Sequence, residues 1–475
     1  MFSLLNRSIV LVLATGTLFA QQPPSSATAA PTLDYQFFKG QVQPIFLKKR
    51  PGHARCVTCH THRIPPLQEL TAGASSWDDE QSRQNFEVWN LFVVPGDPMA
   101  SRLLLHPLAA AAGGDSFHAG GKHWKSQSDP EWQTLAAWVR GQAQGASKTP
   151  EAATPLTAGV VRVLQTNAAG DNIHVIDPAT NKVVAMIEDI EVPHGITISP
   201  DGGRIYVTNE SLVTLDAVDA KTLKVFKRIP LSGRPNNVAV AKDGSKVYAA
   251  IAEDPGFVDV IDTASLTNVK SVPVNGRLHN VYVTPDGKYA VAGAIPARTI
   301  SVIDTATDTL AWTLTLDAGI RPMAFTTNPD GSTKDLIVQL SDFHGFAVVD
   351  FAARKERRRI TLPDPPGRHK EEETLQGSPA HGLAVTPDGK VLWSTSKWYH
   401  SVMAYSLPEY KLLKVVEVGQ HPDWLAITPD GKSLYVAAAG DDLTVVVDTK
   451  TMAVVAKIPV GAVPKRNVAG ALKRP

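Results

Sequence analysis

Short runs of β-favouring apolar residues, separated by turn residues, recur through the last two-thirds of the chain. The dipeptide Asp-Gly stands between two such runs six times, at spacings of 42, 43, 44, 58 and 42 residues. One example is ITISPDGGRIYVTN at residues 196–209, a pattern typical of a β-hairpin. The dipeptides begin at Asp201, Asp243, Asp286, Asp330, Asp388 and Asp430. A period of about 42 residues without a helical pattern predicts four-stranded propeller blades rather than a helical solenoid.

A second β run ends at an equivalent position in every period, which counts seven repeats. These positions are Asp177, Asp219, Asp262, Asp304, Asp350, Ser406 and Asp448. The seventh repeat is split, because residues 160–167 begin as a second strand and residues 461–472 supply the missing inner strand. Pairing of the two segments would close the ring and remove an exposed sheet edge. We therefore expect an all-β seven-bladed propeller over residues 158–475.

Apolar residues at helical spacing mark both ends of an earlier segment. One stripe lies within residues 34–50, and another follows Ser128, which with Glu131 resembles a capping box before the second helix. This pattern predicts a small all-α domain at residues 35–146, joined to the propeller by a linker at residues 147–157. The fold class expected for the whole chain is therefore multidomain, with a small all-α domain followed by an all-β propeller.

The N-terminus resembles a secretory signal. One cation, Arg7, precedes an apolar stretch that ends before a Gln/Pro/Ser/Ala tract, so residues 1–20 are expected to be a signal peptide and residues 21–34 a disordered linker. Cleavage after Ala20 or near Ala30 is left open, and a buried N-terminal helix is the alternative. If residues 1–20 are a signal peptide, the protein is exported to the periplasm or out of the cell.

Composition limits the classes of partner. The 475 residues include 47 Lys and Arg and 46 Asp and Glu, a net charge of +1 that does not favour nucleic-acid binding. Beyond residue 20 no uninterrupted apolar run approaches 18 residues, so no membrane span is expected in the mature chain. The expected partner is instead a periplasmic redox protein or a small-molecule ligand.

The chain has two cysteines, and both belong to the pentad Cys-Val-Thr-Cys-His at residues 56–60. This spacing lets the thiols of Cys56 and Cys59 add to the vinyl groups of one haem, with His60 as the proximal iron ligand. A zinc half-site would want a second Cys/His pair, and a thioredoxin-like pair would want a strand-to-helix context. One covalent haem c per chain is therefore predicted.

The segment around the pentad resembles small bacterial c-type cytochrome domains. The likeness rests on the pentad, on VQPIF at residues 42–46 and on PGDP at residues 95–98. Similar domains often place a Met-Pro-Pro loop before the closing helix, and its absence here implies a histidine as the distal iron ligand. His118 is favoured because glycines follow it, while His123, Met99 and His106 are alternatives. An iron without a sixth protein ligand is a further alternative.

The repeats resemble the YVTN family of seven-bladed propellers in the phrases at residues 206–209, 302–310 and 428–438. The position that opens each inner strand is expected to ring one mouth of the central channel. These positions are His194, Asn236, His279, Arg321, His381, Asp423 and Arg466. Residue 158 is expected to enter the propeller at the opposite face, so that the linker would have to reach around it.

Histidines gather in this predicted ring and beside it. His194, His279 and His381 occupy equivalent repeat positions, and His344 and His400 lie in loops assigned to the same face. They suggest a site for a metal ion or a small anion, although polar residues also suit a water-filled mouth. Affinity near the ordinary histidine pKa of about 6.5 should fall with decreasing pH for a metal and rise for an anion.

Two functions follow from these features. The first is a periplasmic haem c electron-transfer protein whose propeller docks a partner or ligand. The alternative is an oxidoreductase, with chemistry at the histidine-lined mouth and electrons passing through the haem. A propeller that binds only protein and uses haem structurally is a third, weaker reading.

Overall fold

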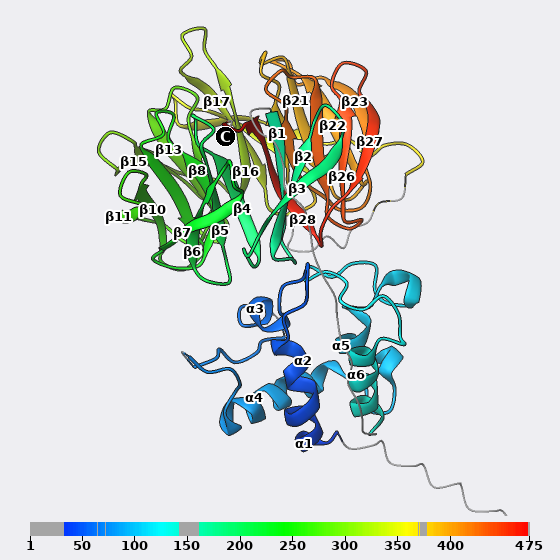
Figure 1. Cartoon of the computed structure of the whole chain (residues 1–475). Coiled ribbons are helices and arrows are strands. Elements are labelled where there is room, and N and C mark those ends of the chain that lie inside the picture. Colours follow the sequence, from blue (N-terminus) through cyan, green and yellow to red (C-terminus); the bar gives the residue numbers. More distant parts are fainter. Residues whose placement is uncertain are drawn as a thin grey trace, which may run out of the picture.

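The computed structural model describes residues 33–63, 65–71, 73–141, 161–368, 370 and 378–473. The proposed signal peptide (1–20), nearly all of the segment 21–34 and the linker 147–157 lie outside these residues. The described chain forms a ring of seven four-stranded antiparallel sheets with a region of short helices at its N-terminal end (Figure 1). The prediction of a seven-bladed propeller is confirmed.

Each blade is a meander in which strands adjacent in sequence pair with each other. The first three blades contain β4 (Pro193–Ile198), β5 (Arg204–Asn209), β6 (Thr214–Asp219) and β7 (Lys224–Pro230); β8 (Pro235–Val240), β9 (Lys246–Ile251), β10 (Gly256–Asp262) and β11 (Thr267–Val274); and β12 (Leu278–Val283), β13 (Tyr289–Ala294), β14 (Thr299–Asp304) and β15 (Thr309–Thr315). The next three contain β16 (Ile320–Thr327), β17 (Thr333–Leu340), β18 (Gly345–Asp350) and β19 (Lys355–Thr361); β20 (Leu383–Val385), β21 (Val391–Ser396), β22 (Ser401–Ser406) and β23 (Leu412–Glu417); and β24 (Pro422–Ile427), β25 (Ser433–Ala438), β26 (Leu443–Asp448) and β27 (Ala453–Pro459).

The seventh blade combines the two ends of the propeller sequence, as predicted. It contains β28 (Pro464–Ala471), β1 (Val161–Asn167), β2 (Asn172–Asp177) and β3 (Lys182–Glu188), in that order. Strands β28 and β1 are antiparallel, with Leu164 opposite Val468. Because β28 covers the edge of β1, that edge is not exposed, and the two ends of the propeller sequence close the ring within one blade.

The repeated aspartates organise the turns of each blade. In the Asp-Gly turn of β24–β25, Thr428 Oγ1 donates to Asp430 Oδ1 at 2.7 Å and Gly431 has φ of +73°. At the end of β26, Asp448 Oδ1 accepts from Thr451 N at 2.7 Å. Each of these turns needs a short side chain that accepts hydrogen bonds and a residue that can adopt positive φ. Because the same turn is repeated from blade to blade, Asp-Gly recurs in the sequence with the period of the blades.

The N-terminal helical region is built from short helices around aromatic residues. Its elements are α1 (Tyr35–Phe37), the π-helical turn η1 (Phe38–Val42), α2 (Gln43–Leu47), α3 (Cys56–His60), α4 (Asp79–Trp89), the 3-10 turns η2 (Asn90–Phe92), η3 (Pro98–Ala100) and η4 (Ala110–Ala112), α5 (Arg102–Leu105) and α6 (Pro130–Arg140). Phe38, Trp132 and Trp138 lie fully buried at its centre. No helix among the described residues is long and apolar enough to cross a membrane.

The two predicted helices are present, with one change at a helix start. The residue that caps α6 is Asp129, whose side chain accepts from Glu131 N at 3.0 Å, and not Ser128. Glu131 therefore does not complete a capping box with Ser128. Its carboxylate instead accepts from Lys48 Nζ at 2.6 Å and pairs with Arg50, which ties α6 to the segment after α2.

Candidate functional site

The Cys-Val-Thr-Cys-His pentad forms helix α3, directly after the extended residue Arg55. Both cysteines are free and half-buried. Burial raises the pKa of Cys56 to about 11 and raises that of Cys59, so both side chains are neutral thiols at neutral pH. The helix places the two thiols and His60 at the wall of one cavity.

His60 and His118 face each other across this cavity. Their ring centroids are 6.4 Å apart and their planes differ by only 22°. Two imidazole nitrogens that bind one metal ion each lie about 2 Å from it, so the centres of two such rings on either side of the ion would be about 6 Å apart. The separation of His60 and His118 would therefore suit two imidazoles that bind one ion.

Backbone carbonyls fix which nitrogen of each ring is available. His60 Nδ1 lies 2.8 Å from Pro65 O, and His118 Nδ1 lies 2.7 Å from Gly121 O. A carbonyl only accepts, so both Nδ1 atoms carry the proton and both Nε2 atoms keep a lone pair. Burial lowers the pKa of His60 to about 4 and of His118 to about 3, which keeps both rings neutral at neutral pH.

The cavity has the size and lining of a cofactor site. Its volume is about 360 Å³, within the range of small-molecule pockets. Its walls include Phe46, Ala54, Trp89, Phe92, Leu103 and Trp124, with Arg55, Arg63 and Arg102 among the charged residues. Two thiols, two facing imidazoles and an apolar wall form a set that could hold a covalently attached haem.

The other predicted distal ligands lie differently. Met99 is 38% exposed and is not part of the cavity wall. His123 lines the cavity, but its ring packs against His53 at 5.0 Å between centroids. His106 also lines it, and its Nδ1 contacts Asp115. Of the four candidates, His118 is therefore the one whose ring is nearly parallel to that of His60.

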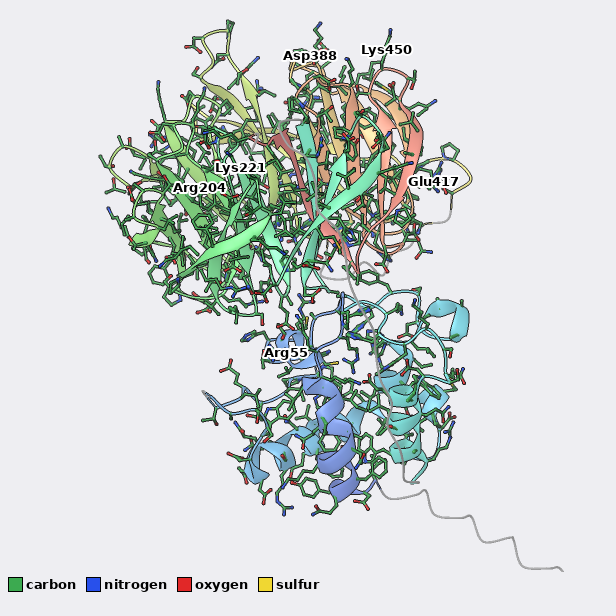
Figure 2. All side chains as sticks on the ribbon, viewed as in Figure 1. Arg55, Arg204, Lys221, Asp388, Glu417 and Lys450 are labelled. Carbon is green, nitrogen blue, oxygen red and sulfur yellow. The ribbon has the colours of Figure 1, made fainter. Side chains whose placement is uncertain are left out.

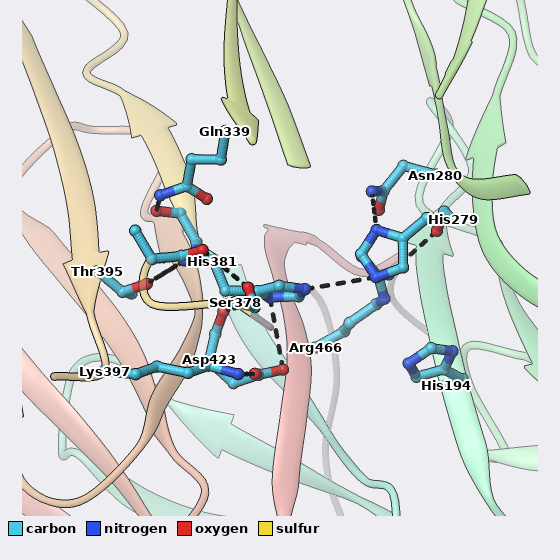
Figure 3. Close-up of polar contacts among 12 residues, drawn as sticks. His194, His279, Asn280, Gln339, Ser378, His381, Thr395, Lys397, Asp423 and Arg466 are labelled. Atoms are coloured by element: carbon cyan, nitrogen blue, oxygen red, sulfur yellow. Dashed lines mark hydrogen bonds and ion pairs between the residues drawn. The ribbon is translucent and has the colours of Figure 1, made fainter. Parts of the chain in front are cut away.

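A second group of polar side chains lies at the propeller axis, where the predicted ring of repeat positions converges (Figure 3). His279 Nε2 and His381 Nε2 are 3.4 Å apart, and Arg466 Nη2 donates to Asn236 Oδ1 at 2.8 Å. Burial lowers the pKa of both histidines well below the ordinary value. These side chains come from four blades, as their repeat positions predict.

The hydrogen bonds of His279 and His381 form a directed chain. Asn280 Nδ2 donates to His279 Nδ1, so the neutral His279 ring carries its proton on Nε2. His381 Nδ1 lies 3.0 Å from Asp423 O, which only accepts, so His381 Nε2 receives the proton of His279. The two imidazoles thus satisfy each other instead of offering two lone pairs to one metal ion.

His194 contacts Glu210, and Asp423 forms a separate ion pair nearby. His194 Nδ1 lies 2.9 Å from Glu210 Oε1, and Lys397 Nζ pairs with Asp423 (Figure 3). Burial by itself would raise the pKa of Glu210, but the neighbouring His194 and the nearby arginines lower it below the ordinary value. Both carboxylates are therefore ionised at neutral pH.

His344 and His400 lie apart from the axial histidines. His344 Nε2 is 2.7 Å from Ser396 Oγ and its ring packs on Trp398, while the His400 ring packs on His421 at 5.8 Å between centroids. Neither belongs to the chain of contacts around His279. Among the residues that the structure describes, no group of three or more His, Cys, Asp or Glu side chains is arranged to hold a metal ion.

The helical region packs on one face of the propeller (Figure 2). This face carries His194 and His421, because Arg63 shares a cavity wall with His194 and Phe117 contacts His421. Arg55 Nη2 donates to Glu191 Oε2 at 2.9 Å, and Ala54 N donates to Ala169 O at 2.6 Å. Phe117 stacks near His421, with 4.7 Å between ring centroids. The segment of the Cys-Val-Thr-Cys-His pentad and the propeller mouth are therefore direct neighbours.

A small cavity lies at this contact and shares its wall with the larger one. Arg63 and Ala119 line both cavities, and His194, Glu210 and Lys465 line only the small one. Of these, Arg63, Glu210 and Lys465 are not among the residues that the sequence analysis singles out. The repeat alignment could have indicated Lys465, because it precedes the ring position Arg466, but no local pattern marks Arg63 or Glu210.

No protein-family model and no curated protein matches the sequence. Among solved structures, the chain is similar to a chain of hydrazine synthase from Kuenenia stuttgartiensis, with 22% identity, a TM-score of 0.53 and coverage of 60% of this chain and 92% of that one. It is also similar to the periplasmic gluconolactonase of Pseudomonas aeruginosa, with 18% identity, a TM-score of 0.55 and coverage of 66% and 100%. Identities this low establish a likeness of fold, and the fold shared is the β-propeller.

Proposed function

We propose that this chain is an exported haem c redox protein whose helical region is a cytochrome c-like domain. The observation that carries the proposal is the pair of nearly parallel imidazoles, His60 and His118, whose unprotonated Nε2 atoms face a cavity that also holds Cys56 and Cys59. A haem bound there would supply transfer of single electrons.

The residues of the cavity have distinct roles in this proposal. Cys56 and Cys59 would each add a thiol S–H across one vinyl group, so that a C–S bond forms and the hydrogen goes to the neighbouring carbon. The carbonyls of Pro65 and Gly121 hold the two imidazoles in one orientation and one tautomer. The aromatic wall excludes water, which limits the change in solvation when the charge of the site changes by one.

The expected location is the periplasm, as the signal-like residues 1–20 indicate. The structural neighbour from Pseudomonas aeruginosa is described as periplasmic, which agrees with that location. We propose that the propeller is of the YVTN type and presents a surface or a ligand to a periplasmic redox partner.

A second candidate is an oxidoreductase whose substrate binds at the propeller mouth. It is favoured by one observation, the wall of Arg63 and Ala119 that separates the haem-motif cavity from the cavity at the mouth. Both structural neighbours have the names of enzymes, so the fold is compatible with this role. Under this reading, substitution of His194 would abolish turnover, whereas simple electron exchange with a partner would continue.

The haem proposal is tested by a pyridine haemochrome assay on protein exported with a cytochrome c maturation system. We expect one covalently retained haem per wild-type chain and none in Cys56→Ser/Cys59→Ser. The matched control is Thr58→Val in the same helix, which should retain its haem. This substitution removes a buried hydroxyl that has no hydrogen-bond partner among the described residues. Wild-type protein without covalent haem would contradict the proposal.

A further inference from the structure

The small cavity between the helical region and the propeller mouth has a volume of about 40 Å³. A cavity of this size has room for about three water molecules or for one ligand of three or four heavy atoms. Its wall includes Arg63 from the helical region and His194, Glu210, Asp423 and Lys465 from the propeller. A ligand in it would touch both parts of the chain.

The two carboxylates on this wall already have cationic partners. Lys397 Nζ pairs with Asp423, and Arg234 Nη1 lies 3.4 Å from Glu210 Oε2. Both carboxylates are largely buried, so these pairs compensate charges that would otherwise be costly to remove from water. The negative charge of the wall is thus matched without any bound ligand.

Two cations on the wall are not matched. Within the part of the chain that the structure describes, the side chains of Arg63 and Lys465 form no hydrogen bond or ion pair, although Lys465 interacts electrostatically with Asp423 and Glu210, and Arg63 with Glu210. Burial lowers the pKa of Lys465 to about 8, which still leaves its ammonium group charged at neutral pH. The two side chains thus add positive charge beyond the cations that already pair with Asp423 and Glu210, and this excess of positive charge on the wall favours binding of an anion.

His194 adds a different kind of group. It is 4% exposed, and its Nε2 has no hydrogen-bond partner among the described residues. Nδ1 lies 2.9 Å from the Glu210 carboxylate, outside hydrogen-bond geometry, and since a carboxylate only accepts, this contact favours the ring proton on Nδ1 and an acceptor at Nε2. A buried acceptor on the cavity wall favours a ligand that carries an O–H group.

We propose that this cavity binds a small monovalent oxyanion that keeps one hydroxyl group, with its charged oxygens toward Arg63 and Lys465 and its hydroxyl toward His194 Nε2. The inference deepens the second candidate function, because it names the ligand class of the propeller mouth. Bicarbonate is the simplest such anion. Nitrate has the same planar shape, charge and number of heavy atoms but has no hydroxyl group, so the pair of anions isolates the contribution of His194.

Isothermal titration calorimetry on the full mature protein at pH 7 tests the proposal. Bicarbonate should bind, and nitrate should bind roughly tenfold or more weakly because the buried acceptor is left unpaired. Arg63→Met and Lys465→Met should each weaken bicarbonate binding by roughly tenfold or more. Lys432→Met removes an exposed lysine from an Asp-Gly turn at the opposite face and should leave binding unchanged.

A second set of variants tests the hydroxyl contact. His194→Leu should abolish the preference for bicarbonate over nitrate, and His194→Gln, whose amide oxygen can accept, should restore part of it. Circular dichroism of each variant verifies folding. Absence of bicarbonate binding in the wild type, equal affinity for nitrate, or unchanged binding in both cation variants would overturn the inference.

The location of the site is tested by soaking crystals with bromide, whose anomalous signal should appear between Arg63, Lys465 and His194. A signal elsewhere would count against the site. The haemochrome assay reports independently on the proposed function. Loss of anion binding in protein with one intact haem would refute this inference alone, and absence of haem in protein that binds bicarbonate would refute only the haem proposal.

Discussion

Arg55, the residue directly before helix α3, forms a two-point ion pair with Glu191 in the loop that leads into the first blade. Arg55 Nε and Nη2 donate to the two carboxylate oxygens at 3.1 and 2.9 Å, and Arg55 N also donates to Oε1 at 2.9 Å. Ser211 Oγ donates to the same carboxylate at 2.9 Å. This one side chain of the propeller therefore holds both the backbone and the side chain of the residue that precedes helix α3.

The first prediction concerns this contact. Glu191→Gln should destabilise the docked arrangement by roughly 1–3 kcal/mol, because it removes a largely buried carboxylate and leaves the Arg55 guanidinium without its charged partner. The measurement is hydrogen exchange of the Ala54 amide, which donates across the contact. Glu188→Gln, at an exposed surface pair with Lys224, is the control and should leave the exchange rate unchanged.

The stability that the Arg55–Glu191 contact contributes should be lost at acid pH. Burial by itself would raise the pKa of Glu191, but hydrogen bonds from Arg55 lower it below the ordinary value of 4.5. Since the folded pKa is lowered, the contribution is fully present above about pH 4.5 and is lost as the pH falls through the lowered pKa. Amide exchange that stays constant from neutral pH to below pH 4, after correction for intrinsic rates, would contradict this.

The second prediction identifies the distal iron ligand. Oxidised haem-loaded protein should lack the weak near-infrared charge-transfer band of methionine ligation. His118→Met should introduce that band and raise the reduction potential, because a thioether ligand favours the reduced iron. Met99→Leu should change neither. Loss of an existing band in Met99→Leu would instead assign Met99 as the ligand.

A third prediction uses the backbone beside that ligand. A Cβ at Gly120 would lie 2.8 Å from His118 Cε1 and 3.3 Å from Nε2, so Gly120→Ala should push the imidazole away from the iron position. We expect covalent haem to remain while the low-spin absorption spectrum is lost. Gly40→Ala, where a Cβ meets nothing within 4 Å, should keep the spectrum. An unaltered spectrum in Gly120→Ala would argue that His118 is not a ligand.

The fourth prediction concerns closure of the propeller. A chain ending at Val463 lacks β28, so β1 would lose the register that pairs Leu164 with Val468. A loss of about 4 kcal/mol would lower the midpoint of thermal unfolding on the order of 10 °C, and complete failure to fold is the more extreme form of the same result. A chain ending at Lys473 should melt as the full chain does. Identical melting of both truncated chains would disprove closure by β28.

The fifth prediction is the pH dependence of bicarbonate binding. Lys465 faces Asp423, Arg63, Lys397 and Glu210, and its pKa of about 8 means that its charge is present below pH 8 and lost above it. Affinity should therefore fall as the pH rises from 7 to 9, and calorimetry across this range measures it. Lys465→Met should have a flat profile over the same range.

Histidine titration should contribute little near neutral pH. The sequence predicts a change in anion affinity near pH 6.5, the ordinary pKa of a histidine. Burial instead lowers the pKa of His194 to about 4, and the pKa values of His279 and His381 lie well below 6.5. A steep change between pH 6 and 7 would show that these rings are more hydrated than the structure indicates.

The parts of the fold that the sequence predicts are those encoded by a local and repeated pattern. The Asp-Gly turns and the strand-end aspartates recur because each blade needs the same turn, so seven blades and a split seventh blade follow from spacing alone. Equivalent positions such as His279 and His381 converge for the same reason. Helix α4 was not predicted, although the capping box of Asp78 and Gln81 marks its start, because its apolar residues, Phe86, Val88 and Trp89, all lie near its end.

The contact between the two parts of the chain has no such pattern. Arg55 and Glu191 are 136 residues apart, and each is an ordinary charged residue in its own segment. A single sequence does not indicate which arginine forms an ion pair with which distant glutamate. The position of Arg63 at the wall of both cavities depends on this docking, and for that reason the mouth cavity was not predicted.

Pairing of the final strand, β28, also completes the propeller mouth, because β28 carries residues of that mouth. Lys465 and Arg466 belong to β28, and Gln165 Nε2 of β1 donates to Arg466 O across 301 residues of sequence. The mouth is therefore complete only after the last strand has been made and paired. A ligand that binds Lys465 would bind the closed ring and not the open chain. It would therefore stabilise the closed ring, and opening of the ring would become less favourable as the ligand concentration rises.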